Sequence, residues 1–593
     1  MNDHFPLFRG NRIRLIIQPH RIMKQCKWQI KSVDTKSVNN IAETFGLSKT
    51  IARLMSLKGI KSKNISNSFY SHKESDTHDP FLMQDMDKAA DRMVHAIKTK
   101  DTILIFGDFD ADGTTSVAFL TLFLQSISNN LEVYYYIPNR YNEGYGLSKK
   151  GIDYAKYIGA NILITCDCGI TNIEEVAYAQ NLGIDVIITD HHQPSKFLPD
   201  AYAIINPNRI DCNYPFKGLC GAGVVFKLAI AICKKASFDQ NKAWAHTDLI
   251  TLGIAADMVP INDENRVIVI DGLSKIKNNN NLGISSLIKT SRLVTENITI
   301  GKIIFGLIPK INAAGRLGDA SRAVKLLVTK NPVLSYEIAK KLEKENDRRK
   351  NITQKIVNDA QLMVESDCDL GKEKIIILKN KGWHIGVIGI VASQIKELYN
   401  RPAVIIAMEE LEGKGSCRSI PNFDLVNALN NCKDLLLNYG GHPMAAGLSI
   451  KKNNYKEFKK KLLEIAEKKI NKKDLEPVIH IDAEVSLKEI NQNMINFLNV
   501  LEPYGPKNSK PIFISRNLFI EGIPQIIGKN QNSIKFSVKE DKTPFESIGF
   551  NMINHYEKLI QNLPIDIAYV INESTWNNKK SIQLELKDIR MGS

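Results

Sequence analysis

The sequence contains no apolar run near the roughly 18 to 20 residues that a helix needs to cross a bilayer, which excludes a membrane protein and a membrane partner. Its first 22 residues also lack the apolar core of a signal peptide, because their apolar stretches are far too short, as at residues 15–17. We therefore expect a cytoplasmic protein. Met23 precedes the strand-like residues 27–31 and is a candidate for the true start of the chain.

Cysteine is sparse and irregularly placed. The nine cysteines are an odd number spread over positions 26 to 432, which is a poor disulfide framework and indicates a reducing compartment. Cys166 and Cys168 form a CxC, but no second Cys or His pair stands at zinc-finger spacing, so we expect no structural zinc. We interpret these two thiols as packing residues around the intervening Asp167.

The composition of the 593 residues is that of a folded globular protein, with 43% hydrophobic and 24% charged residues. Its length suggests about four domains. Lys and Arg total 79 against 64 Asp and Glu, a net charge of +15 that favours a polyanionic partner. An A/T-rich genome that encodes Lys and Asn freely would give the same excess, so charge alone leaves both explanations open.

Residues 100–210 repeat a short β-branched run, a polar or glycine turn and a helical stretch. Continuous apolar strands that alternate with helices indicate a doubly wound α/β domain with a parallel sheet. The predicted strands are residues 103–106, 133–137, 162–165, 186–189 and 203–205. Further on, the pattern predicts a long helix with a charged centre at 343–350, expected to be a solvated connector. A second α/β unit from residue 374 and a small C-terminal β-barrel follow it.

Three carboxylates follow the first predicted strand, at Asp108, Asp110 and Asp112. Ligands of open α/β sheets bind at the carboxyl ends of the strands, so this is the expected edge for an active site. Carboxylates at alternate positions repel one another unless a cation compensates them, and hard oxygen ligands suit Mg²⁺ or Mn²⁺. The alternative is an acidic turn that the dipole of the following helix stabilises.

Two more strand ends carry the same residue types. Asp167 ends the strand that begins at residue 162, and Asp190, His191 and His192 end the strand that begins at residue 186. Three segments that deliver Asp and His to one sheet edge make a purely structural explanation improbable. Asp257, at the end of an apolar helix, adds a carboxylate whose burial would be costly without a cation. Such a set can hold two ions about 4 Å apart that clamp a phosphodiester.

Several ordered motifs resemble those of the DHH phosphoesterase family. They are FGDFDADG, PNRYNEGYGL, TCDCGI, TDHH and GIAADMVP. Four later strings resemble the single-strand-specific exonuclease branch of that family: residues 309–319, 383–393, 415–419 and 440–447. The match runs from about residue 25 to the end. It implies an N-terminal extension and lead-in segment (1–75), a DHH catalytic domain (76–330), a connecting helix (331–366), a DHHA1 domain (367–472) and a C-terminal OB-fold (473–593).

The resemblance implies a hydrolase with two catalytic ions, Mn²⁺ or Mg²⁺, that releases nucleotides from the 5′ end of single-stranded DNA. The ligands carried over by motif are Asp110, Asp112, Asp167, His191 and Asp257, with Asp167 as the bridge between the ions. Asp108 is a ligand or a neighbour of one, Asp190 orients a histidine, and His192 donates a hydrogen bond to the phosphoryl oxygen or the leaving group.

The candidate nucleic-acid contacts lie in the same motifs. Arg316 and Arg418 are the strongest phosphate-binding candidates, because arginine pairs bidentately with phosphate. For Arg418 the alternative is a solvated surface charge, and for the turn that carries Arg140 and Tyr145 a purely structural role. The remaining candidates are Asn312, Arg349, His384, Ser393 and His442. Lys507 stands where glycine is common in the family.

The leading hypothesis is a single-strand DNA exonuclease in recombination and repair. A short-oligonucleotide or cyclic-dinucleotide phosphodiesterase shares the DHH and DHHA1 units but is usually shorter and lacks the barrel. A catalytically dead replication scaffold would be expected to have lost ligands, and a pyrophosphatase would not need this barrel. A single-strand-binding protein and a RecQ-type helicase are partners that the family implies.

Overall fold

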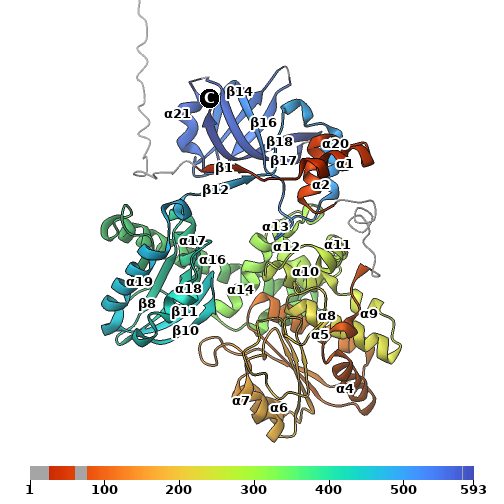
Figure 1. The fold of residues 1–593 in the computed structure, drawn as a ribbon. Coiled ribbons are helices and arrows are strands. Elements are labelled where there is room, and N and C mark those ends of the chain that lie inside the picture. The colour runs from red at the N-terminus through yellow and green to blue at the C-terminus, as the bar shows by residue number, and fades with distance from the viewer. Residues whose placement is uncertain (1–25, 61–75, 542, 562, 577–578, 593) are drawn as a thin grey trace, which may run out of the picture.

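The computed structural model describes residues 26–60, 76–541, 543–561, 563–576 and 579–592. The candidate start at Met23 lies outside these residues. Three lobes are visible in Figure 1: the α/β domain with its following helices, a second α/β lobe beside it, and a β-barrel above both. Among the described helices, none combines the length and the apolar character that a membrane crossing requires.

The first sheet has the order β3-β2-β4-β5-β6, with every pair parallel. Its strands are β2 (Ile103–Gly107), β3 (Val133–Tyr136), β4 (Ile162–Cys166), β5 (Asp185–Thr189) and β6 (Ala203–Ile205). Alternate strand residues pack on opposite faces. Ile105 and Ile164 share one core with residues of α4 (Met86–Thr99), α5 (Ala111–Ile127) and α8 (Gly221–Ala236). Leu104 and Leu163 contact α6 (Lys149–Tyr157) and α7 (Ile173–Asn181). The predicted doubly wound sheet is confirmed.

A helical region continues the same core and positions the far wall of the site. It comprises α9 (Asn241–Trp244), α10 (Thr247–Ala256), α11 (Asp263–Lys277), α12 (Leu282–Thr290), α13 (Ile300–Lys302), α14 (Ile308–Leu317) and α15 (Ser321–Val328). Between α13 and α14 the chain forms one π-helical turn, residues Ile303–Leu307. Pro309 at the start of α14 has no N–H to donate, which suits the first turn of a helix.

The long helix α16 (Pro332–Asp367) joins the first lobe to the second. The expectation that its charged centre is solvated holds for only part of it: Lys344, Asp347, Arg348 and Lys350 are exposed, whereas other residues of the centre pair with the first lobe. Glu343 forms an ion pair with the buried Lys310 of α14, and Glu345 accepts two hydrogen bonds from Arg322 of α15. Asn346 is only 1% exposed. Glu343 and Glu345 thus pair with polar partners on α14 and α15. The residue pattern of α16 alone could not predict these pairs.

The second lobe contains a five-stranded sheet of order β10-β11-β9-β8-β7, in which only β7 and β8 run parallel. The strands are β7 (Ile376–Asn380), β8 (Ala403–Met408), β9 (Glu412–Arg418), β10 (Leu436–His442) and β11 (Ala445–Lys451). One face packs on α16 and α17 (Ile388–Tyr399), the other on α18 (Leu425–Asn430) and α19 (Tyr455–Lys469).

The C-terminal lobe is a barrel of five strands in the order β14-β15-β16-β18-β17, closed by pairing of β14 with β17. Its strands are β14 (Phe513–Ile527), β15 (Ser533–Lys539), β16 (Phe545–Gly549), β17 (Ile565–Trp576) and β18 (Lys579–Met591). The short β13 (Ala483–Glu484) extends this sheet, and α20 (Gln492–Val500) and α21 (Tyr556–Leu559) flank the barrel. The predicted barrel is confirmed.

The described part of the N-terminal segment, residues 26–60, packs on this barrel. β1 (Lys27–Ile30) pairs in parallel with β12 (Val478–Ile481), far away in sequence. α1 (Thr35–Phe45) and α2 (Lys49–Leu57) bury Ile41 and Leu54 in the barrel core. These residues belong to the predicted N-terminal extension and lead-in segment (1–75), and the structure packs them on the C-terminal lobe (Figure 1).

Lys507 lies in a turn with φ of 60°, the left-handed region that favours glycine. The neighbouring Pro506 carbonyl accepts a hydrogen bond from the Ile261 N–H of the first lobe. Lysine therefore occupies a backbone conformation that glycine adopts more readily, and the turn docks the barrel on the α/β domain through the Pro506 carbonyl.

Candidate active site

The carboxyl ends of β2, β4 and β5 bring the predicted acidic and histidine side chains to one sheet edge. Asp110 is the N-cap of α5, and its Oδ1 accepts hydrogen bonds from the N–H groups of Asp112 (2.9 Å) and Gly113 (3.1 Å). Asp112 lies in the first turn of α5, where a negative charge is favoured. The sequence thus folds into a loop that points three carboxylates toward β4 and β5.

Three overlapping groups of side chains have their potential ligand atoms within 4.8 Å of one another. The groups are Asp108, Asp110 and Asp167, then Asp112, His191 and Asp257, and finally Asp167, His191 and His192. His191 Nε2 lies 3.0 Å from Asp167 Oδ1, 3.9 Å from Asp112 Oδ2 and 3.7 Å from Asp257 Oδ2. Asp167 and His191 each belong to two groups, so they lie between the others.

These residues fit a pair of divalent cations. Oδ1 of Asp108 and Oδ1 of Asp167 are buried and accept no hydrogen bond within the described chain. Burial and the charge of Asp110 raise the pKa of Asp108 well above its usual value, and burial and the charge of Asp112 do the same to the pKa of Asp167. Buried carboxylates that repel one another and lack donors form a site that a cation would stabilise.

The other ligands follow the same physics. Burial and the charge of Asp110 raise the pKa of Asp112 to about 6. Partial burial and the charges of Asp112 and Asp110 raise the pKa of Asp257 to about 8. The Asp257 side chain is 36% exposed at the end of α10, so the cost of burial considered from the sequence applies to it only in part. Burial lowers the pKa of His191 to about 4, so its imidazole is neutral and able to bind a metal.

His192 is held differently from His191. Its Nδ1 lies 2.8 Å from Asp190 Oδ1 and 3.1 Å from the hydroxyl of Tyr145. Burial opposes a charge on this ring, but the hydrogen bond and charge of Asp190 dominate and raise the pKa of His192 to about 9. Asp190 also accepts the Ile170 N–H at 3.0 Å. His192 is therefore protonated at neutral pH, and its Nε2 is the nitrogen left for a substrate.

A first prediction concerns Asp190. Its replacement by asparagine weakens the contact that orients and charges His192, and we expect kcat of the hydrolysis implied by the motif resemblance to fall about 10- to 100-fold, the usual cost of losing a group that orients a histidine of a metal site. Mn²⁺ binding should stay within about threefold of the wild type, measured by calorimetry. A loss of metal affinity equal to the loss of kcat would contradict this role.

Several residues that position the site were not identified from the sequence. Asp112 accepts the N–H groups of Gly221 (2.7 Å) and Ala222 (3.0 Å) at the start of α8. A Cβ at Gly221 would lie 2.5 Å from the Cβ of Asp167, so glycine is required there. Asn206 and Asn208 donate to the carbonyls of His192 (2.9 Å) and His191 (2.5 Å). Their place just after β6, a fourth strand end, was the available signal.

Four predicted arginines form a cationic cluster beside the carboxylates. Burial and the charges of Arg140, Arg349 and Arg418 lower the pKa of Arg316 to about 10, which places the other three guanidinium groups around Arg316. Arg316 Nη1 donates to the Gly386 carbonyl of the second lobe (3.1 Å), and the Tyr141 hydroxyl donates to the Arg316 carbonyl. The cluster draws on both lobes and on α16.

The remaining candidates divide into two kinds. Asn312 and Ser393 use their side chains within the protein: Asn312 Oδ1 accepts the Ala111 N–H at 2.9 Å, and the Ser393 hydroxyl donates to the Gly389 carbonyl at 3.1 Å. His384 Nδ1 accepts the Gly386 N–H at 3.0 Å, next to Arg316. His442 is exposed, and Ala445 pairs with both it and Arg418, so His442 and Arg418 share one row across the second sheet.

Comparisons with known proteins agree with this architecture. Residues 102–254 match the family model described as DHH family, N-terminal domain, residues 372–470 match the DHHA1 domain, and residues 481–588 match the RecJ OB domain. A parallel α/β domain with this acidic sheet edge, a DHHA1 lobe and an OB barrel together define a DHH-family hydrolase.

The chain is 35% identical over 569 residues to the single-stranded-DNA-specific exonuclease RecJ of Bacillus subtilis, covering 96% of this chain and 71% of the relative. It is 31% identical over 527 residues to the RecJ of Escherichia coli, covering 85% and 90%. The chain belongs to the RecJ family.

Solved structures agree. RecJ of Thermus thermophilus in complex with Mn²⁺ superimposes with a TM-score of 0.79 at 25% identity, over 96% of this chain and 80% of that one. An exonuclease RecJ bound to manganese aligns with a TM-score of 0.56 at 31% identity, over 65% of this chain and 94% of that one.

Proposed function

We propose that this protein is a metal-dependent exonuclease that degrades single-stranded DNA from its 5′ end, in DNA recombination and repair. The observation that carries the proposal is the overlap of ligand groups at one sheet edge, with buried carboxylate oxygens that accept no hydrogen bond. The arginine cluster beside them supplies the positive charge that a phosphodiester backbone needs.

We assign the ion-holding role to Asp110, Asp112, Asp167, His191 and Asp257, with Asp108 as a further candidate. Two Mn²⁺ or Mg²⁺ ions held there would polarise the phosphodiester and provide a nucleophile from water. Charged His192, fixed by Asp190, donates a hydrogen bond from Nε2 to a phosphoryl oxygen or to the leaving oxygen. Arg316 and Arg418 hold a neighbouring phosphate and so align the chain for in-line attack.

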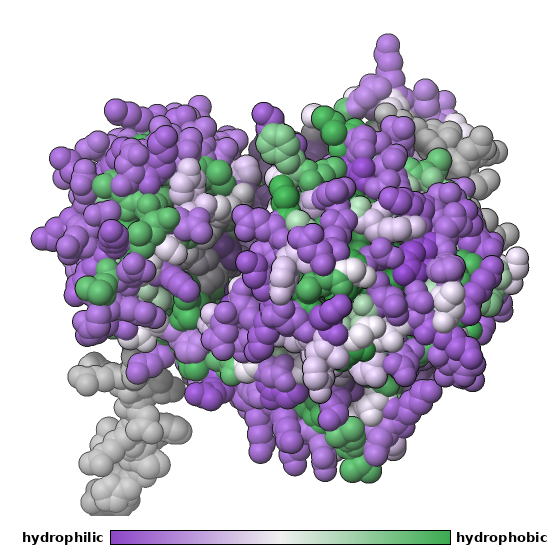
Figure 2. Space-filling model, turned by 90° about the horizontal axis from the view of Figure 1, so that it is seen from below, coloured by the Kyte–Doolittle hydropathy of each residue, from purple (hydrophilic) through white to green (hydrophobic). Residues whose placement is uncertain are grey.

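Selectivity for a single strand is attributed to the groove between the first two lobes, which Figure 2 shows as a hollow across this face of the molecule. Arg316 and Gly386 contact each other across it and narrow it. The barrel supplies further binding surface, where Phe519 and Phe550, 48% and 57% exposed, each offer a stacking face to a base. A short-oligonucleotide phosphodiesterase would have no use for this surface.

The deciding experiment is digestion of an end-labelled single strand, its duplex and a dinucleotide with Mn²⁺, Mg²⁺ or EDTA. We expect metal-dependent release of the 5′ label from the single strand alone. Cleavage of the dinucleotide alone would instead assign the phosphodiesterase activity, and no cleavage of any substrate would assign a scaffold.

A second prediction concerns metal and stability. Adding Mn²⁺ at about 100 times its Kd should stabilise the α/β domain by about 2.7 kcal/mol. This corresponds to a rise of about 5 °C or more in its unfolding temperature, measured by calorimetry against EDTA. The rise should be lost when Asp167 is replaced by asparagine. An equal rise in that variant would mean that Mn²⁺ binds elsewhere.

The finer assignments complete the proposal. We propose the domain limits given above, with residues 26–60 added to the barrel lobe. Single-stranded DNA is the substrate, a single-strand-binding protein and a RecQ-type helicase are the partners, and the cytoplasm is the compartment. All nine cysteines are free thiols, which supports a reducing compartment.

A further inference from the structure

A separate pocket opens beside the metal-site carboxylates and is not used by the proposed mechanism. It has a volume of about 580 Å³ and runs along β3, the edge strand of the first sheet, between α6 and the junction of α14 and α15. Its wall includes Phe109, which stands between Asp108 and Asp110 in the chain, so the pocket borders the loop that carries these carboxylates.

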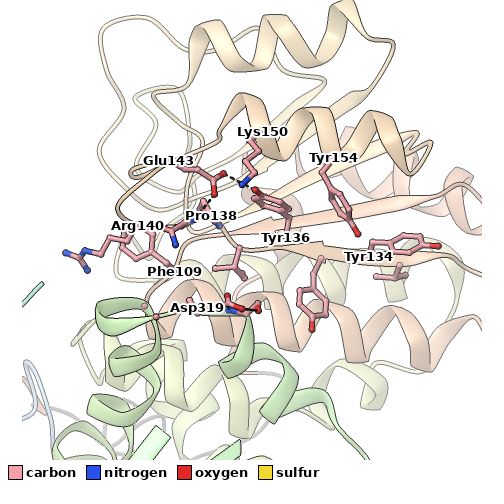
Figure 3. Close-up of a pocket in the computed structure, with 17 residues that line it drawn as sticks. Phe109, Tyr134, Tyr136, Pro138, Arg140, Glu143, Lys150, Tyr154 and Asp319 are labelled. Carbon is pink, nitrogen blue, oxygen red and sulfur yellow. Dashed lines mark hydrogen bonds between the residues drawn. The ribbon is translucent and has the colours of Figure 1, made fainter. Parts of the chain in front are cut away.

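Aromatic side chains dominate this pocket. Figure 3 shows Tyr136 and Tyr154 together on the α6 side, Tyr134 further along the strand, and Asp319 on the opposite wall. Tyr136 is stacked on Phe106 at 5.6 Å between ring centroids, which fixes its ring. Tyr134 is 39% exposed although it lies on a sheet strand. A pocket of this size with several aromatic faces suits a planar heterocycle.

The charges of the pocket are arranged for a phosphate at one end. The Arg140 guanidinium lies 5.0 Å from the centre of the Phe109 ring and belongs to the arginine cluster. The two acidic residues of the lining, Glu143 and Asp319, already accept hydrogen bonds from the chain. Glu143 accepts from the Tyr136 and Ser148 hydroxyls and the Asn139 N–H, and Asp319 accepts from Ser321. Lys150 adds a second cation to the lining.

We propose that this pocket binds the base of a nucleoside 5′-phosphate, with the base against Tyr134, Tyr136 and Tyr154 and the phosphate toward Arg140. The inference rests on the proposed function in one respect: it takes the ligand to come from the single-stranded DNA that the enzyme degrades. Two sources share this chemistry: the terminal nucleotide of the DNA strand before cleavage, and the mononucleotide released after it.

The loop between β3 and α6 joins the pocket to the site. Glu143 holds this loop from the Tyr136 side, and the loop's Tyr145 contacts His192. A base that packs on Tyr136 therefore lies against the same short segment that supports the histidine. Occupancy by a released nucleotide would place product next to the catalytic residues and slow the next turnover.

The test uses the full-length protein in EDTA and deoxyadenosine 5′-monophosphate (dAMP) as the probe, in equilibrium dialysis. Tyr134→Ala should weaken dAMP binding at least about fivefold, the lower end of the cost of losing a base-stacking aromatic. Tyr157→Ala is the matched control, because Tyr157 is 86% exposed on α6 and does not line the pocket. Lys150→Ala, paired with the neighbouring Lys149→Ala, tests the charge. Deoxyribose 5-phosphate, which lacks the base, should bind wild type and Tyr134→Ala equally.

Steady-state kinetics then separate the sources. A fivefold rise of KM for single-stranded DNA in Tyr134→Ala assigns the pocket to the strand. An unchanged KM with a fivefold weaker inhibition by dAMP assigns it to the product. The inference is overturned if wild type shows no saturable dAMP binding, or if Tyr134→Ala and Lys150→Ala both bind dAMP within twofold of wild type. Failure of wild type to degrade single-stranded DNA would overturn the proposed function instead, and the dialysis result does not depend on it.

Discussion

Replacing Asp167 by asparagine is expected to reduce hydrolysis of single-stranded DNA at least about a thousandfold and to leave DNA binding intact. Asp167 belongs to two of the three ligand groups, and its Oδ1 is buried without a hydrogen bond. Loss of its charge removes the ligand shared between the ions. Such ions stabilise the transition state by several kcal/mol, and each contribution of about 1.4 kcal/mol corresponds to a tenfold change in rate. The measurement is kcat on an end-labelled oligonucleotide with Mn²⁺.

Asparagine is the right substitution because Asp167 has φ of 64°, a conformation that asparagine adopts more readily than alanine. Binding of an unlabelled strand, followed by fluorescence anisotropy in EDTA, should stay within about threefold of wild type. Asp153→Asn is the matched control, because Asp153 is exposed on α6 and belongs to none of the three ligand groups. Near-wild-type turnover by the Asp167 variant would show that the shared-ligand assignment is wrong.

The sheet and its acidic edge were predictable because their signals are local. β-branched runs marked the ends of all five strands to within one residue. The side chains that follow three of those runs meet at one edge because parallel strands end together. The role of Asp190 in orienting a histidine was implied by the motif resemblance, and the structure places its Oδ1 2.8 Å from His192 Nδ1.

What the sequence did not reveal depends on partners distant in the chain. The pairing of β1 with β12 joins residues 27–30 to residues 478–481, and the sequence of neither strand indicates its partner. The charged centre of α16 suggested solvent because its partners, Lys310 and Arg322, lie on other helices. In the sequence, Gly221 resembles any glycine at the start of a helix. Only the structure shows that a Cβ on Gly221 would lie 2.5 Å from the Cβ of Asp167.

Replacing Arg316 by alanine is expected to raise KM for single-stranded DNA about 10- to 100-fold with a smaller change in kcat. Arg316 lies beside Arg140, Arg349 and Arg418, and its Nη1 reaches the Gly386 carbonyl in the second lobe. A charge-assisted contact to a phosphate contributes about 1.5 to 3 kcal/mol, which corresponds to this range of affinity. Lysine should restore little of it, because it cannot form a bidentate pair.

The salt dependence of binding distinguishes a phosphate contact from a structural role. If Arg316 neutralises one backbone phosphate, its loss reduces the slope of log K against log salt by about 0.7 for a single strand. Lys325→Ala on α15 removes an exposed cation of the same domain outside the cluster and should leave slope and KM unchanged. A raised KM with an unaltered slope in the Arg316 variant would mean that Arg316 acts by joining the lobes through Gly386 and does not bind a phosphate. Another residue of the arginine cluster would then bind the phosphate, and Arg418 is the one to test next.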